Sequence, residues 1–179
     1  MQKNMHASWS DQTIIVAPGG AKNALADDHL RRWPVENYAR LISLLKERGA
    51  VVIVTGAETD AWVLPHFKGL AFENLIGRQG ILELIETLKS ADWLITHDSG
   101  PMHLAKLAGC RVIALFGPTN PHEKVSPREK IHVLWGGEDL PCRPCYNGKR
   151  YADCPYPTCL AQITPEQILR VIDENSLCL

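Results

Sequence analysis

Residues 95–105, with the sequence ITHDSGPMHLA, place an acid, a hydroxyl and a glycine between a predicted buried strand and a predicted helix. Free N–H groups and the helix dipole favour an anion at such a joint. Gly100 lets a ligand approach the backbone closely, and Pro101 fits the first helical turn. The Ser99 hydroxyl either caps the helix or bonds a phosphate oxygen, and Asp98 either contacts a ligand or stabilises the turn. The joint therefore indicates an anion site, with a purely structural role as the alternative.

Two more joints follow predicted strands. Gly19 and Gly20, in APGGAKN, are able to form a concave backbone surface for an anion. They match neither the dinucleotide pattern G-x-G-x-x-G nor the Walker pattern. Glu58, in TGAETD, stands where an acid grips a ribose diol in nucleotide-binding sheets. Tight-turn glycines and a solvated surface acid are the structural alternatives at these positions.

Arg31 and Arg32 stand directly before Trp33 and Pro34, at the entrance to a predicted helix. Their guanidinium groups are fork-shaped donors that suit phosphate. A solvated surface charge is the alternative for each arginine.

Four cysteines crowd into one proline-rich loop with the spacing C-x₂-C-x₈-C-x₄-C: Cys142, Cys145, Cys154 and Cys159. Four thiolates at short spacing suit a tetrahedral structural Zn²⁺. Only the first pair has the tight C-x-x-C spacing of a zinc knuckle, however, so free thiols or a disulfide are alternatives to zinc.

Short apolar runs alternate with stretches of helical periodicity, which predicts an α/β fold: a Rossmann-like, doubly wound parallel sheet of about six strands. Such sheets bind ligands beyond the carboxyl ends of their strands. We expect residues 1–12 to be a disordered or tag-like segment and residues 13–179 to form one domain, with the cysteine-rich loop at 140–160. The strands are predicted at residues 13–17, 51–55, 74–76, 93–96, 112–116 and 131–134.

The composition is that of an ordinary globular chain, with 179 residues, 45% of them hydrophobic and 22% charged. A formal net charge of -1 gives no pull toward nucleic acid. No apolar run approaches the roughly 20 residues of a membrane-spanning helix, and the first residues do not resemble a secretory signal. We therefore expect a cytoplasmic protein, with association at the inner face of a bacterial inner membrane as an option.

Two long stretches carry a resemblance to a known family: RRWPVENYARLISLLKERGAVVIVTGAETD and NLIGRQGILELIETLKSADWLITHDSGPMHLAKLAGCRVIALFGPTNP. From about Thr13 to Ile172, the chain resembles the carboxyl-terminal half of glycosyltransferase family nine, the ADP-heptose:lipopolysaccharide heptosyltransferases. DSGPMHLA followed by ALFGPTNP is the most specific pairing. The resemblance implies the GT-B architecture, in which two Rossmann-like domains face a cleft. This chain corresponds to the domain that holds the nucleotide sugar.

The resemblance implies a role for each charged residue of the joints. Arg31 takes the place of a family lysine that contacts the donor diphosphate. Glu58 matches the acid that holds the ribose, and Asp98 matches one that contacts sugar hydroxyls. His103 is expected to support the site from the next helical turn. The family lines its adenine pocket with the segment that corresponds to residues 75–78.

Ser99, Gly100 and Pro101 match the helix start that binds the donor diphosphate in the family. An inverting transfer also needs a base, and the family supplies it from an aspartate of the amino-terminal domain. We expect no catalytic base in this chain, and its catalytic residue is therefore unknown. We also expect no required cofactor, because GT-B enzymes need no divalent cation for departure of the leaving group.

The expected partners are an ADP-sugar donor and a lipopolysaccharide-type acceptor held by a separate amino-terminal domain. The isolated chain is then expected to bind donor but to transfer sugar poorly or not at all. The alternatives are a stand-alone nucleotide-sugar-binding module without transferase activity, a subunit of a split enzyme, and another GT-B-like enzyme such as a sugar-nucleotide epimerase.

Overall fold

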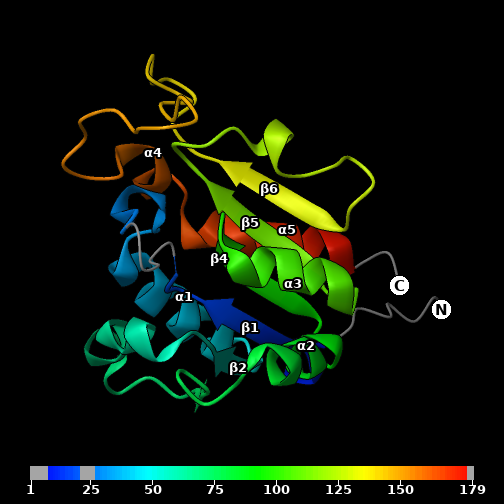
Figure 1. Ribbon diagram of the computed structural model, residues 1–179. Coiled ribbons are helices and arrows are strands. Elements are labelled where there is room, and N and C mark those ends of the chain that lie inside the picture. The colour runs from blue at the N-terminus through cyan, green and yellow to red at the C-terminus, as the bar shows by residue number, and fades with distance from the viewer. Residues whose placement is uncertain (1–7, 21–26, 177–179) are drawn as a thin grey trace.

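The fold is built on one sheet of six parallel strands, as the sequence predicts (Figure 1). The computed structural model describes residues 8–20 and 27–176. The strands lie in the order β3-β2-β1-β4-β5-β6, so the chain reverses its direction of growth between β1 and β4. Their bounds are β1 Thr13–Ala17, β2 Val51–Val54, β3 Glu73–Asn74, β4 Trp93–His97, β5 Arg111–Phe116 and β6 Ile131–Trp135.

Helices cover both faces of this sheet, which confirms the doubly wound α/β class. On one face the core contains buried side chains of α1 (Val35–Glu47), η3 (Glu58–Phe67) and α5 (Pro165–Ser176). On the other face, α2 (Ile81–Lys89) and α3 (Gly100–Ala108) pack on a second cluster. The central strand β4 is buried along its whole length, as expected for a strand with helices on both sides.

The predicted helix boundaries have visible causes. Helix α1 follows Pro34, whose fixed φ suits a helix start, and ends before Gly49 at φ +93°. Helix α5 begins with a reciprocal cap: the Gln167 N–H donates to Thr164 Oγ1 and the Thr164 N–H donates to Gln167 Oε1. Thr164 is therefore the N-cap of this helix.

The amino-terminal segment corrects one expectation. Residues 8–12 are ordered around the short turn η1 (Trp9–Asp11), because Trp9 packs against the core and its Nε1 donates to Asp173. The guanidinium of Arg48 lies 4.7 Å from the centre of the Trp9 ring. Residues 1–7, also predicted to be disordered or tag-like, lie outside the described residues.

Three short segments complete the described chain: η2 (His29–Arg31), η4 (Pro121–Glu123) and α4 (Thr158–Ala161). η2 precedes α1, and η4 replaces a full crossover helix between β5 and β6. None of the helices in residues 8–20 and 27–176 combines the length and apolarity that crossing a bilayer requires.

Candidate functional site

The joint between β4 and α3 leaves a helix N-terminus without a side-chain cap. Ser99 occupies the N-cap position, but its Oγ donates to the His97 carbonyl and lies 3.1 Å from Thr96 Oγ1. The capping role considered for Ser99 is therefore wrong. The Gly100 N–H has no hydrogen-bond partner within the described part of the chain. An unpaired N–H at the positive end of a nine-residue helix is suited to an anion.

Gly100 differs from the other glycines of the chain because the surrounding protein does not require glycine at this position. All thirteen lie in the described residues; seven have a φ between +69° and +93°, and five of the other six would bring a Cβ within 3.0 Å of a neighbouring atom. At Gly100 the backbone is ordinary, and a Cβ would have no neighbour within 4 Å. Because neither the backbone nor the packing requires glycine there, the missing side chain leaves room for something outside the protein.

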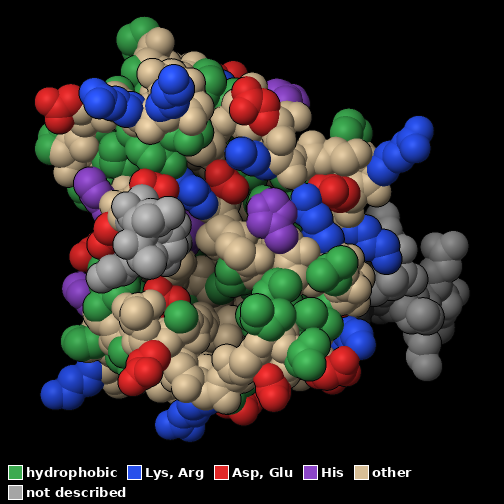
Figure 2. Space-filling view, viewed as in Figure 1, with side chains coloured by type: hydrophobic (Ala, Val, Ile, Leu, Met, Phe, Trp, Pro, Cys, Tyr) green, Lys and Arg blue, Asp and Glu red, His purple; other side chains and the backbone are tan. Residues whose placement is uncertain are grey.

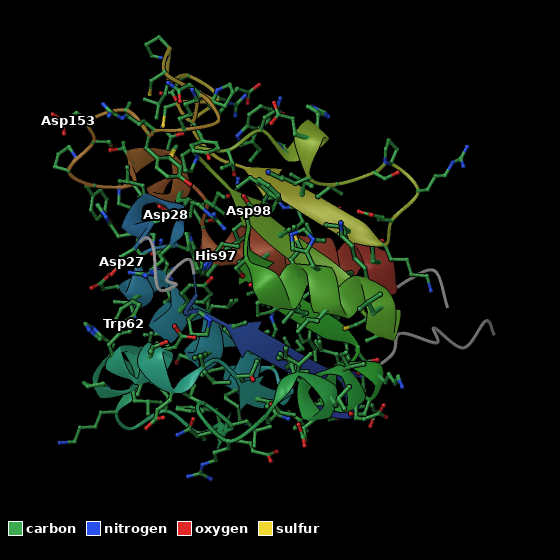
Figure 3. The ribbon with its side chains drawn as sticks, viewed as in Figure 1. Asp27, Asp28, Trp62, His97, Asp98 and Asp153 are labelled. Atoms are coloured by element: carbon green, nitrogen blue, oxygen red, sulfur yellow. The ribbon has the colours of Figure 1, made fainter. Side chains whose placement is uncertain are left out.

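Arg31 reaches this joint from η2. Its Nε donates to the Asp98 carbonyl at 3.1 Å, its Nη2 donates to the same oxygen, and its Nη1 lies 3.5 Å from Asp28 Oδ2. The Asp98 carboxylate lies 3.9 Å from Arg31 Nε and accepts a bond from Thr119 Oγ1 at 3.0 Å. The structure thus brings Arg31 and Asp98 together, as expected. Figure 3 shows His97 and Asp98 at the end of β4, with Asp28 on the same side of the sheet.

A buried acid that the sequence reasoning missed holds the two glycine loops together. Asp60 is only 5% exposed, and its two oxygens accept from the N–H groups of Gly20 and Ala57, both at 2.8 Å. A Cβ at Gly19 would lie 2.1 Å from Asp60, and one at Gly56 would lie 2.8 Å from it. Both glycines are therefore needed to make room for this carboxylate.

The Asp60 contact corrects the prediction for the first loop. The Gly20 N–H is bound to Asp60, and the Gly20 carbonyl accepts from Arg32 Nε at 2.9 Å. Gly20 is held by charged side chains at both its N–H and its carbonyl, so its N–H is not available to a phosphate. The Gly19–Gly20 loop shapes the site, and Gly100 offers a backbone donor without an internal partner.

Replacing Asp60 with Asn should loosen both loops. An amide presents one oxygen and one NH₂ group, so one of the two buried N–H donors loses its acceptor, at about 1–3 kcal/mol of stability. Urea unfolding measures the change. Glu58→Gln is the matched control, because Glu58 is an exposed acid two residues away and should change stability by less than about 0.5 kcal/mol. Equal stability of the two variants would contradict this role of Asp60.

A cavity of about 310 Å³ lies at the carboxyl ends of the central strands and is bordered by the two loops and the α3 start. Its polar and backbone lining comes from Gly20, Gly56, Asp60 and Gly100. Apolar and amide side chains complete it from β2 and the start of α2, namely Thr55, Gln79, Ile81 and Leu84. In the space-filling view, apolar side chains gather over α2 and α3 beside a hollow in the surface (Figure 2).

Two further predicted site residues, Glu58 and His103, do not line the cavity. Glu58 is exposed at the start of η3 and packs its backbone close to Gly77. Asp60, rather than Glu58, borders the cavity. His103 is exposed on α3, one helical turn beyond the joint. Ser99 and Pro101 lie at the joint, and Pro101 also lines the cavity.

A fully buried histidine lies directly before the joint. His97 Nδ1 is 3.3 Å from the Tyr38 hydroxyl, and its Nε2 has no partner among the described residues. Burial lowers the pKa of His97 to about 3, with smaller contributions from Arg31 and Arg32. The imidazole is therefore neutral at ordinary pH. Burial also raises the pKa of Tyr38, so its phenol keeps its proton.

Comparison with known proteins decides the family. The family model described as glycosyltransferase family 9 (heptosyltransferase) matches residues 2–154. The chain belongs to glycosyltransferase family 9. Lipooligosaccharide heptosyltransferase 2 of Haemophilus influenzae is 31% identical over 153 residues, which cover 80% of this chain and 43% of that protein. The chain thus spans less than half the length of this family 9 relative.

Solved structures share the fold. The ADP-heptose lipopolysaccharide heptosyltransferase II of Escherichia coli superposes with a TM-score of 0.69 at 24% identity, over 93% of this chain and 46% of that one. The predicted Rossmann-like half of a family 9 enzyme is confirmed at the level of fold. The dodecameric heptosyltransferase TibC, solved with ADP-D-β-D-heptose and called iron-containing, gives a TM-score of 0.67 at 18% identity, covering 93% and 45%.

The predicted zinc site in the cysteine-rich loop is not assembled. Cys142 is exposed, Cys154 Sγ donates to the Tyr156 carbonyl, and Cys159 Sγ lies against Gly117. Cys145 and its three companions are free thiols. Across residues 8–20 and 27–176, no group of three or more His, Cys, Asp or Glu side chains is placed to hold a metal ion. As placed, the four thiols do not form a zinc centre.

Proposed function

We propose that this chain is the donor-binding half of a heptosyltransferase and that it binds ADP-heptose. Gly100 carries the proposal, because its unpaired N–H and the open space beside it lie at a helix N-terminus that borders a cavity. The family 9 relatives are heptosyltransferases, and one solved neighbour is an ADP-heptose lipopolysaccharide heptosyltransferase. A dinucleotide-binding site is disfavoured by the absence of G-x-G-x-x-G after β1.

The proposed arrangement places the two ends of the donor against different surfaces. The diphosphate lies against the Gly100 N–H, where the α3 dipole favours negative charge. The guanidinium of Arg31, 22% exposed, adds positive charge at the same joint. The nucleoside lies in the cavity toward α2, with Glu58 as the predicted acid for the ribose. Asp98 is the predicted contact of the sugar hydroxyls, and Ser99 and Pro101 shape the helix start beside it.

In the transfer reaction the acceptor hydroxyl attacks the anomeric carbon while the bond from that carbon to the diphosphate oxygen breaks. A base takes the hydroxyl proton, and the departing diphosphate must be stabilised as its negative charge grows. The Gly100 amide, the α3 dipole and Arg31 perform the second task in our proposal. The lipopolysaccharide-type acceptor and the base belong to an amino-terminal domain equivalent to the unmatched part of the relatives.

Calorimetry with ADP tests the binding half of the proposal. We expect a folded sample to bind ADP with a measurable heat at millimolar concentration or below, and adenosine more weakly, because the diphosphate contacts the helix start. A folded sample that gives no heat with ADP contradicts the proposal.

A transfer assay tests the division of labour. ADP-heptose and a lipopolysaccharide inner-core acceptor are incubated with this chain alone and with a separately produced amino-terminal domain from a relative. Transfer only in the mixture supports a donor-binding half. Transfer by the chain alone would place a base within it, and donor binding without transfer in either sample would favour a stand-alone binding module.

A further inference from the structure

The loop that joins β6 to α4 carries a closed turn at residues 146–151, which we call the 146–151 turn (Figure 1). The Asn147 N–H donates to the Arg150 carbonyl at 3.1 Å. The Asn147 side-chain oxygen accepts from the N–H groups of Lys149 and Arg150 at 3.0 and 2.9 Å. The Tyr146 hydroxyl donates to the Gly148 carbonyl at 2.9 Å. These hydrogen bonds fix the backbone conformation of the turn.

The first anchor of the 146–151 turn is the segment that follows β5. The Tyr146 N–H donates to the Pro118 carbonyl at 3.1 Å. Pro118 directly precedes Thr119, whose hydroxyl donates to the Asp98 carboxylate at 3.0 Å. The start of the turn is therefore attached to the same segment that holds the predicted contact of the sugar hydroxyls.

The second anchor is the Asp28–Arg31 pair at η2. The Tyr151 hydroxyl lies 3.5 Å from Asp28 Oδ2, and the same oxygen lies 3.5 Å from Arg31 Nη1. Burial raises the pKa of Tyr151, and the neighbouring Arg31 opposes this increase. Arg31 also donates to the Asp98 carbonyl. Both ends of the turn are therefore tied to groups that surround the β4–α3 joint.

The 146–151 turn presents two cations without a partner in the described part of the chain. Lys149 and Arg150 are exposed, and their side chains make no hydrogen bond or ion pair with residues 8–20 or 27–176. Arg143, the third cation of residues 140–152, is occupied, because it donates to the Trp135 carbonyl and lies over the Trp135 ring. Residues 140–152 contain no Asp or Glu. The turn thus carries positive charge that no neighbouring residue in sequence opposes.

The position of the turn separates it from the donor cavity. The residues that line this cavity, all within the described chain, include none from the 146–151 turn. In the proposed arrangement the donor diphosphate faces Gly100 and Arg31, and the donor sugar lies beside Asp98. The turn is attached to the Asp98 side of the joint through Thr119 and Arg31. A molecule that contacts both the turn and the donor sugar is then the second reactant, the acceptor.

We propose that the 146–151 turn is an acceptor-recognition site that binds an anionic saccharide through Lys149 and Arg150. This inference rests on the proposed function, because it assumes that the donor sugar lies at Asp98. The Arg150 guanidinium suits two parallel hydrogen bonds to a phosphate or a carboxylate, and Lys149 adds a compact charge. The half-buried rings of Tyr146 and Tyr151, with centres 4.7 Å apart, offer apolar surface to a sugar ring. Because the turn is preformed, less ordering is required on binding.

NMR titrations of the labelled chain, with ADP present, test this site. The probes are glucose 6-phosphate, glucuronate, neutral methyl glucoside and inorganic phosphate. We expect an anionic sugar at millimolar concentration to shift the amide signals of Gly148, Lys149 and Arg150, and methyl glucoside to leave them unchanged. The stronger of the two anionic sugars identifies the phosphate or the carboxylate as the preferred group. Inorganic phosphate should bind more weakly than glucose 6-phosphate, because it lacks the sugar ring.

A charge-removing variant tests the two cations directly. Lys149→Gln combined with Arg150→Gln should weaken binding of the anionic sugar by about five-fold and leave ADP affinity unchanged. The matched control combines Arg128→Gln with Lys130→Gln, two exposed cations in the loop before β6, and should bind the sugar as the wild type does. In the transfer assay with the amino-terminal domain, the turn variant should raise the KM for the acceptor and leave the KM for ADP-heptose unchanged.

The outcomes separate this inference from the proposed function. A chain that binds ADP but shows no shift of the turn signals with either anionic sugar overturns the inference and leaves the proposed function intact. Equal binding of inorganic phosphate and glucose 6-phosphate overturns it as well, because the turn then attracts an adventitious ion only. A loss of ADP affinity in the turn variant would assign Lys149 and Arg150 to the donor instead. A chain that binds no ADP refutes the proposed function and this inference with it.

Discussion

Gly100→Val should abolish measurable ADP binding while leaving the fold intact. A Cβ at this position meets no atom within 4 Å outside the neighbouring helix backbone, and the residue has no left-handed φ, so neither packing nor backbone conformation requires glycine there. The added methyl groups would instead fill the space beside Gly100, which borders the cavity. Displacing a diphosphate from a helix N-terminus should reduce affinity by about 100-fold or more, equivalent to about 2.7 kcal/mol.

Calorimetry with ADP and urea unfolding are measured on the same sample. Gly100→Ala is the graded control: it should be as stable as the wild type or more stable by up to about 1 kcal/mol, because the unfolded chain loses freedom. Its ADP affinity should fall less than that of the valine variant. If Gly100→Val is folded and binds ADP as the wild type does, the diphosphate does not lie at this helix start.

The second large effect concerns acid stability. His97 is neutral in the folded chain because burial lowers its pKa to about 3, whereas an unfolded histidine has a pKa of about 6.5. Between these two values the unfolded chain binds the additional proton, so the free energy of unfolding falls as the pH is lowered through this window. The His97 contribution amounts to about 2–3 kcal/mol between pH 7 and pH 4.5.

Urea unfolding of the wild type and His97→Gln at both pH values isolates this contribution. Gln does not titrate, so the stability difference between the two proteins at pH 7 should shrink or change sign at pH 4.5. Groups such as Glu129 and Glu166, whose pKa values are lowered, titrate in both proteins and cancel in the comparison. Parallel pH dependences would show that His97 becomes protonated in the folded chain.

Sequence by itself determined the strands of the sheet and the strand-to-helix joints at its edge. The runs TIIVA and VVIVT are short, apolar and bounded by turn residues, and these local properties are enough to predict buried parallel strands. Gly100 and Pro101 likewise indicated a strand-to-helix joint, now seen between β4 and α3, because they follow an apolar run and Pro101 fits the first helical turn. Arg31 was expected near the α3 start through the family resemblance, and the geometry places its guanidinium on the Asp98 carbonyl at that joint.

Only the tertiary structure decided which groups at that edge are free. Asp60 and Gly20 are 40 positions apart, and their hydrogen bond exists because β1 and β2 are neighbours in register. That bond removes the Gly20 N–H from the predicted anion site. The Ser99 hydroxyl turns toward the end of β4, which leaves the Gly100 N–H unpaired. The cysteine spacing suggested a metal cluster, yet among the described residues no group of three or more His, Cys, Asp or Glu side chains is placed to hold a metal ion, and Cys142 is exposed.

The physical reason is the sequence distance between the residues that interact. Strand and helix formation follows from backbone conformation and the periodic burial of neighbouring residues, which a sequence displays directly. The occupancy of a hydrogen-bond donor depends on which distant acceptor the packed fold brings within about 3 Å, and no local pattern encodes that distance. Gly100 illustrates both: its type was visible in the sequence, and its freedom from every internal constraint became visible only in the folded chain.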